Sequence, residues 1–191
     1  MIRRGLAAIF LCTLAAPAAG TEDYIVIWDA GAECDVLDGD SLRCGEARLR
    51  LAGIDAPERD QPYGRQATQH LIGLLKKHTV FCVTEKKDGY GRWLAVCTFT
   101  WQSGQDELAM SIAEDLVRRG LAFHYARYTQ GERAVILARA QEQARMAGNG
   151  VWTGGFVLPC DWRREKARAP LRQRWHILDE TCLHQAPPAR R

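Results

Sequence analysis

Two pairs of cysteines, each placed symmetrically about a turn sequence, constrain the fold of this 191-residue chain more than any other feature. Cys34 and Cys44 are equidistant from the glycine of an Asp-Gly-Asp sequence, and Cys82 and Cys97 are equidistant from the centre of an Asp-Gly-Tyr-Gly sequence. Residues placed symmetrically about a hairpin turn face each other on one side of the sheet, at a separation that a disulfide can bridge. The spacing therefore predicts two β-hairpins, each closed by a disulfide.

Residues 1–20 have the order of a signal peptide. Two arginines precede an apolar stretch, and small residues follow it at 16–20. A core helix at the N-terminus is the competing interpretation. The apolar stretch is too short to cross a bilayer, and no later segment reaches the roughly 20 apolar residues that a transmembrane helix needs. We therefore expect a secreted or periplasmic protein without a membrane span.

The cysteine count agrees with export. Removal of Cys12 with the leader leaves six cysteines, an even number, as expected in an oxidising compartment. After the two hairpin pairs, Cys160 and Cys182 remain and form the third predicted disulfide by elimination. A zinc site is the rival interpretation, but the sequence has no Cys-x-x-Cys pair to support it.

Charge is nearly balanced in the mature chain and unevenly distributed. Of the 26 Lys and Arg residues, two lie in the leader, which leaves 24 against 23 acidic residues. Residues 162–191 carry eight basic and three acidic residues, whereas residues 21–161 are net acidic. A basic tail either contacts a polyanion through counterion release or is simply solvated, and both interpretations stay open.

Short strand-like segments and three amphipathic segments alternate along the chain. Strands are expected at 24–28, in the hairpin around 38–40, and at 48–51, 79–84 and 93–100. Helices are expected from about 67 to 77, from 111 to the stop at Gly120, and from about 132 to 147. This order favours an α+β fold, with a five-stranded Greek-key barrel of the OB type and three helices.

Acidic and basic side chains gather in the segments 38–41, 50–58 and 88–92. Each segment alone is weak evidence of function, since Asp-Gly is a common hairpin turn and charged loops are usually just solvated. Together they are informative, because carboxylates from two loops suit a hard cation such as Ca²⁺ and arginines grip phosphate with two hydrogen bonds. The combination favours phosphoryl chemistry.

Five ordered segments resemble the staphylococcal nuclease-like (thermonuclease) family; they are 36–41, 50–58, 88–92, 116–122 and 150–152. The resemblance implies an OB-fold domain over residues 21–154 and a monomeric endonuclease. It would hydrolyse DNA and/or RNA with Ca²⁺ and leave 3′-phosphate and 5′-hydroxyl ends. A catalytically silent nucleic-acid-binding module of the same fold is the alternative. Residues 155–191 are not explained by the resemblance and are interpreted as a disulfide-pinned, basic C-terminal extension.

The resemblance also implies a calcium site. Asp40 and Asp55 would be the direct carboxylate ligands of Ca²⁺, and the backbone carbonyl of Ala56 a further ligand. Asp38 would be a neighbouring acid that supports these ligands without binding the ion directly. The family has a threonine where this chain has Ala56, which is harmless if only the carbonyl binds the metal.

Catalytic roles follow from the same resemblance. Glu58 would hold the attacking water, either as its general base or mainly to orient the reacting groups. Arg50 and Arg92 would bind the scissile phosphate and stabilise the transition state.

Three tyrosines are expected at the substrate. Tyr90 would lie beside the nucleotide phosphates, and Tyr125 and Tyr128 fall roughly where the family places aromatic side chains for the base. Packing of Tyr125 and Tyr128 into the barrel is an equally acceptable alternative.

Overall fold

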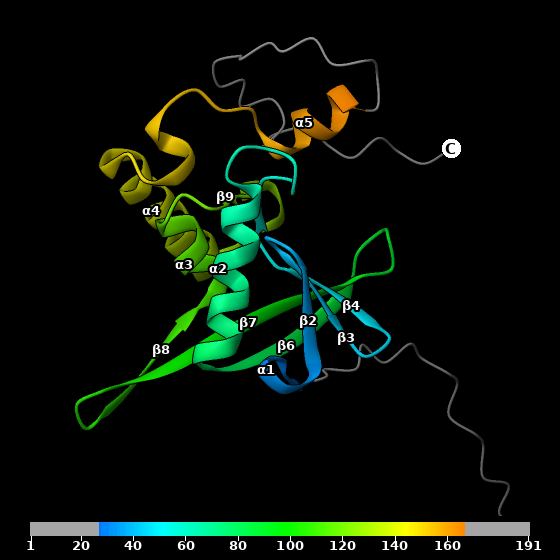
Figure 1. Cartoon of the computed structure of the whole chain (residues 1–191), viewed down its shortest axis with the longest axis vertical. Coiled ribbons are helices and arrows are strands. Elements are labelled where there is room, and N and C mark those ends of the chain that lie inside the picture. The colour runs from blue at the N-terminus through cyan, green and yellow to red at the C-terminus, as the bar shows by residue number, and fades with distance from the viewer. Residues whose placement is uncertain (1–26, 167–191) are drawn as a thin grey trace, which may run out of the picture.

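A strongly curled sheet with helices packed on it dominates the computed structural model, which describes residues 27–166 (Figure 1). The strands are β1 (Ile27–Asp29), β2 (Cys34–Asp38), β3 (Ser41–Cys44), β4 (Ala47–Leu51), β5 (Ile54–Asp55), β6 (Thr79–Lys87), β7 (Trp93–Ser103), β8 (Asp106–Ser111) and β9 (Phe123–His124). The helices are α1 (Ala30–Glu33), α2 (Gly64–Lys77), α3 (Ile112–Arg118), α4 (Gly131–Ala147) and α5 (Pro159–Lys166), with 3₁₀ turns at Ala126–Tyr128 and Gly150–Thr153.

Both disulfide-linked hairpins are confirmed. Cys34 lies directly opposite Cys44 in the β2–β3 pair and is bonded to it, and Cys82 lies opposite Cys97 in the β6–β7 pair and is bonded to it. Cys160 is also disulfide-bonded. Its predicted partner, Cys182, lies outside the described residues.

The α+β class is confirmed, and the sheet of the described residues is curled but not closed into a barrel. Seven strands form one sheet in the order β1-β6-β7-β4-β3-β2, with β8 added beside β7, and β5 and β9 form a separate pair. Strands β1 and β2 lie at opposite ends of this order, yet only the four residues of α1 separate them in the chain. The sheet must therefore curl to bring its two edges together, and α1 stands where a closing strand pair would be.

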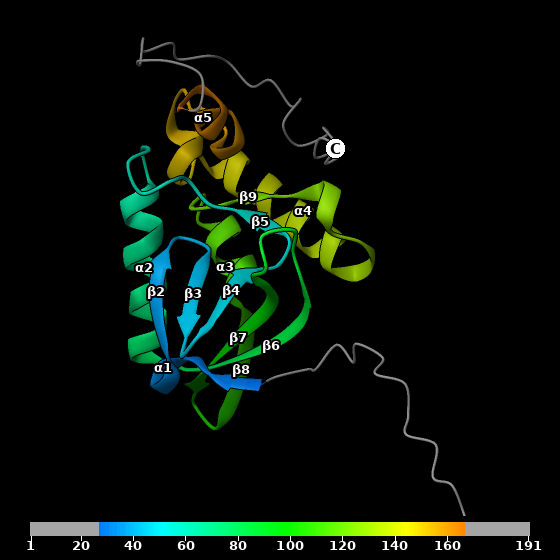
Figure 2. The same ribbon diagram turned by 90° about the vertical axis from the view of Figure 1, so that its right-hand side faces the viewer.

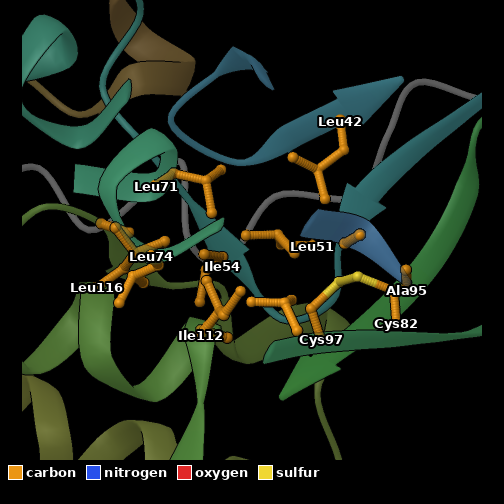
Figure 3. Close-up of a cluster of buried hydrophobic side chains, with 14 of the residues drawn as sticks. Leu42, Leu51, Ile54, Leu71, Leu74, Cys82, Ala95, Cys97, Ile112 and Leu116 are labelled. Carbon is orange, nitrogen blue, oxygen red and sulfur yellow. A yellow bond between two sulfur atoms is a disulfide. The ribbon is translucent and has the colours of Figure 1, made fainter. Parts of the chain in front are cut away.

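The three predicted helices are α2, α3 and α4, and the structure adds the short α1 and α5. Helix α2 packs against β2, α3 against β7, and α4 against α3. Figure 3 shows leucine and isoleucine side chains of α2 and α3, among them Leu71, Leu74, Ile112 and Leu116, meeting Leu51 of the sheet. No helix within residues 27–166 is long and apolar enough to cross a membrane.

A buried carboxylate links α2 to α3. Asp115 accepts hydrogen bonds from His70 Nε2 at 2.5 Å and from Arg119 Nε at 2.9 Å. Burial alone would raise the pKa of Asp115, but the hydrogen bonds from these two side chains outweigh burial and lower it. Ionised Asp115 therefore stabilises the contact between the two helices.

One end of the sheet collects the loops that carry the predicted site. The β2–β3 turn, the β4–β5 corner and the β6–β7 loop all lie at the upper end in Figure 2, and α5 lies beyond them above the start of α2. The segments singled out in the sequence therefore come together in space.

Candidate active site

The β2–β3 turn and the β4–β5 corner place two buried carboxylates on either side of one arginine. Arg50 of β4 lies opposite Ser41 of β3, next to Asp40 in the turn. Gly39 allows this turn to approach the corner, because a Cβ at Gly39 would lie only 2.8 Å from the Ala56 Cβ. A side chain at position 39 would push the turn away from the site.

Arg50 joins the two predicted calcium ligands. Its Nη1 donates to Asp40 Oδ1, and its Nη2 donates to Asp55 Oδ1 at 2.6 Å and to the Ile54 carbonyl at 3.1 Å. The second oxygen of Asp40, Oδ2, accepts from the backbone N–H of Ala56 at 2.7 Å. The structure therefore brings together four of the residues predicted to form the site.

The two carboxylates and the arginine are largely buried, so water screens their charges only weakly. The Asp40 and Asp55 side chains are each only 3% exposed, and that of Arg50 is 14% exposed. Burial raises the pKa of Asp40 to about 7; the Arg50 charge opposes this shift, and the neighbouring Asp38 and Asp55 carboxylates add to it. Burial would lower the pKa of Arg50, but the two carboxylates outweigh burial and raise it. Asp40 thus depends on nearby cations to stay ionised.

The chemistry of this donor set fits a hard cation. Two carboxylates and the adjacent Ala56 carbonyl offer only oxygen atoms, which Ca²⁺ prefers. Within residues 27–166, no three His, Cys, Asp or Glu side chains are gathered in a ready-made metal cluster. A calcium site here would accordingly use two carboxylates, a backbone carbonyl and water.

The loop that carries Glu58 is held tightly against the start of α2. The Glu58 backbone N–H donates to Gln61 Oε1 at 3.0 Å. Tyr63 adopts the left-handed conformation, with φ of 69°, and a Cβ at Gly64 would lie 1.8 Å from the Glu58 carbonyl oxygen. Only glycine therefore fits where α2 begins, and this close contact fixes the position of the Glu58 backbone.

A third arginine, Arg163 of α5, reaches Asp55 and Glu58 and was missed by the sequence analysis. Its Nη2 lies 2.9 Å from Asp55 Oδ2, and its Nη1 lies 3.2 Å from Asp55 Oδ1 and 2.6 Å from Glu58 Oε1. Burial would lower the pKa of Arg163, but the charges and hydrogen bonds of these two acids outweigh it and raise the pKa. The only signal in the sequence was an aromatic-basic run after Cys160, in a segment that the family resemblance does not explain.

Arg92 lies at the same end of the sheet but pairs with its own loop in the described structure. Its Nε and Nη2 lie 2.8 and 2.7 Å from Asp88 Oδ2. Arg50 lies opposite Leu94 in the parallel β4–β7 pair. Arg92 lies two residues before Leu94, in the loop that ends where β7 begins at Trp93. Neighbouring Tyr90 is 83% exposed, with the Arg92 guanidinium 5.4 Å from its ring centre.

Tyr125 and Tyr128 form an aromatic pair near Asp55. Their ring centres lie 4.6 Å apart, and the Tyr125 backbone N–H donates to the Gly53 carbonyl at 2.8 Å. Burial raises the pKa of Tyr125, and the negative charge of Asp55 raises it further. Tyr128 is 49% exposed, so the alternative that both tyrosines pack the core does not hold.

Comparison with known proteins agrees with this geometry. The family model for staphylococcal nuclease homologues matches residues 48–154, which is more than half of the chain. An uncharacterized endonuclease of Haemophilus influenzae is 32% identical over 137 residues, covering 69% of this chain and 71% of that protein. An uncharacterized endonuclease of Escherichia coli O157:H7 is 33% identical over 138 residues, covering 69% of this chain and 82% of that protein.

Plant relatives are longer. A probable staphylococcal-like nuclease of Oryza sativa is 29% identical over 131 residues, covering 67% of this chain but only 36% of that protein. The shared part is therefore about a third of the plant protein, while it is most of the bacterial ones. The family match and the bacterial relatives together establish that this chain belongs to the staphylococcal nuclease family.

Proposed function

We propose that the protein is an exported, calcium-dependent endonuclease that hydrolyses DNA, RNA or both and leaves 3′-phosphate and 5′-hydroxyl ends. The convergence of Asp40 and Asp55 on Arg50 carries this proposal, because phosphodiester hydrolysis needs acids, a cation and guanidinium groups together. The names of the relatives, endonuclease and staphylococcal-like nuclease, support the same chemistry. The hairpin disulfides support export, since disulfides persist in oxidising compartments.

In the proposed reaction, Asp40, Asp55 and the Ala56 carbonyl hold Ca²⁺, which when bound supplies positive charge beside the scissile phosphate. Glu58 orients the attacking water and accepts its proton. The water oxygen forms a new bond to phosphorus, and the bond from phosphorus to the 5′-oxygen breaks. The 5′-oxygen takes a proton from solvent water and leaves as a hydroxyl, and Glu58 then releases the proton that it accepted to solvent.

The arginines have complementary tasks in this proposal. Arg50 and Arg92 donate hydrogen bonds to the phosphoryl oxygens, where negative charge increases in the transition state. Arg92 would exchange its Asp88 partner for a phosphoryl oxygen when substrate arrives. Tyr90 would lie beside the nucleotide phosphates, and the Tyr125–Tyr128 pair offers a partly exposed aromatic surface for a base.

The test is release of acid-soluble nucleotides from single-stranded DNA and from RNA, with Ca²⁺ or with excess chelator. We expect chelator to abolish cleavage, and Glu58→Gln to lower turnover by about 10²–10⁴-fold, the usual contribution of a general base. Glu46→Gln is the matched control, because Glu46 is an exposed glutamate in the turn between β3 and β4, outside the proposed site. Cleavage that survives both the chelator and Glu58→Gln would contradict the proposal. Binding of nucleic acid without cleavage would favour the silent binding module instead.

A further inference from the structure

Helix α5 carries an arginine into the acidic site from outside the part of the chain that the family match covers. The match ends at residue 154, and α5 begins at Pro159. Arg163 donates to both oxygens of Asp55 and to Glu58, which are the acids proposed to hold the metal and the water. Three hydrogen bonds from one guanidinium to two functional acids make this a specific contact.

The rest of α5 and the segment before it make two further hydrogen bonds to the domain. Trp162 Nε1 donates to Asp60 Oδ1 at 3.3 Å, and Gln61 Nε2 donates to the Val157 carbonyl at 2.5 Å. These contacts hold the extension against the loop that follows Glu58.

Apolar packing adds to this anchoring. A second apolar cluster is formed by Phe123, Val151 and Leu158, with Phe156 and Trp152 packed against it. Cys160, in the first turn of α5, packs against the same cluster. The helix is therefore docked independently of Arg163, and the arginine side chain can move without undocking it.

A guanidinium and a calcium ion compete for the same carboxylate oxygens. Both are cations, and Asp55 is nearly fully buried, so their mutual repulsion there is poorly screened. Arg50 cannot easily leave, because its side chain is only 14% exposed. Arg163 is 42% exposed, so its long side chain can swing into water.

We propose that Arg163 competes with Ca²⁺ for Asp55 while it also holds Glu58, so that α5 sets the calcium concentration at which the nuclease becomes active. This inference rests on the proposed calcium-dependent function. In this proposal, Arg163 occupies the acids of the site when calcium is absent, and it does not touch the substrate.

The direct test is calcium binding measured by isothermal titration calorimetry on the purified, oxidised protein without nucleic acid. We expect Arg163→Gln to bind Ca²⁺ about tenfold more tightly, since an occupant that blocks the site in nine of ten molecules weakens the apparent affinity tenfold. Arg163→Lys keeps the charge but loses the planar fork and should fall between the two. Arg164→Gln is the matched control, because Arg164 pairs with Asp161 in the same helix, and its affinity should stay near the wild-type value.

The calcium dependence of cleavage is a second readout, and it distinguishes failure of this inference from failure of the proposed function. The calcium concentration for half-maximal cleavage should fall in Arg163→Gln by the same factor as the dissociation constant. Equal or weaker calcium binding by Arg163→Gln, with calcium-dependent cleavage intact in the wild type, would overturn the competition and leave the nuclease standing. Absence of both calcium binding and cleavage in wild type and variants would overturn both.

Discussion

Arg50 and Arg92 have the same predicted chemical task, but their surroundings predict very different effects on stability. Arg50 lies between two carboxylates that are each 3% exposed, and its own side chain is 14% exposed. Arg92 is 25% exposed and pairs with Asp88, four residues earlier in a hairpin loop. Substitution of each arginine by glutamine therefore separates a structural cation from one that serves mainly the substrate.

The magnitudes follow from burial. Removal of one partner from a buried ion pair costs about 3–5 kcal/mol, because the remaining charge is left without compensation. For a chain of this size, a loss of that kind lowers the melting temperature by about 6–20 °C. Loss of the Arg92–Asp88 pair, which is partly exposed and joins residues of one loop, costs about 1 kcal/mol, the upper end of the range for surface pairs. We therefore expect Arg50→Gln to be strongly destabilised and Arg92→Gln to unfold nearly like the wild type, while both lose most of their turnover.

The assay is urea denaturation of the three proteins in chelator, followed by nuclease rates with saturating calcium for those that are folded. Chelator removes any metal that could compensate for the missing guanidinium. Equal unfolding free energies for Arg50→Gln and Arg92→Gln would refute the assignment of Arg50 as the cation that neutralises the buried acids. A large loss of stability in Arg92→Gln with turnover retained would make Arg92 structural instead.

The other predictions concern packing, pH and the third disulfide. Gly64→Ala should destabilise the protein by about 1–3 kcal/mol, because its Cβ would meet backbone, whereas Gly73→Ala, with open space on the same helix, should gain about 0.5–1 kcal/mol in urea denaturation. The lowered pKa of Asp115 means that its ionised form stabilises the fold above the ordinary value of 3.8 and that this stability is lost as the pH falls below it. Unfolding measured against pH should therefore show a smaller acid-induced loss in Asp115→Asn, and an unchanged acid limb would refute the role of this carboxylate. Non-reducing peptide mapping should recover Cys160 linked to Cys182, and a different partner for Cys160 would contradict the pairing by elimination.

Local patterns in the sequence predicted the hairpins and helices well. The symmetric cysteines fixed the registers of β2–β3 and β6–β7, because a one-residue slip would place the two sulfur atoms on opposite faces. The leucines at helical spacing in α2 turn the same face toward the sheet, as expected. These features depend on residues close together in the chain.

Nonlocal features were harder to predict. Strands β5 and β9 have two residues each, too few to show a period in the sequence. They pair although α2, β6, β7, β8 and α3 lie between them in the chain. Strand β8 is largely exposed and lacks a clear alternation of buried and exposed side chains. Whether the sheet closes depends on how α1 joins its two edges, which is a property of the whole curled sheet.

The residues of the candidate site also differ in whether the sequence could predict them. Asp40, Arg50 and Asp55 could be assigned to one site because they lie in motifs with a recognisable order. Arg163 could not, because it is 108 residues away from Asp55 in sequence. Its position depends on how α5 docks through Leu158 and its neighbours, and the family resemblance does not cover that segment.

The most direct test of the central claim is end-group analysis of a defined oligonucleotide incubated with the purified protein, with and without calcium. We predict fragments that carry 3′-phosphate and 5′-hydroxyl ends, formed with calcium and absent in excess chelator. Intact oligonucleotides of both DNA and RNA under all conditions, or the same fragments in chelator, would contradict a calcium-dependent nuclease built on Asp40, Asp55 and Glu58.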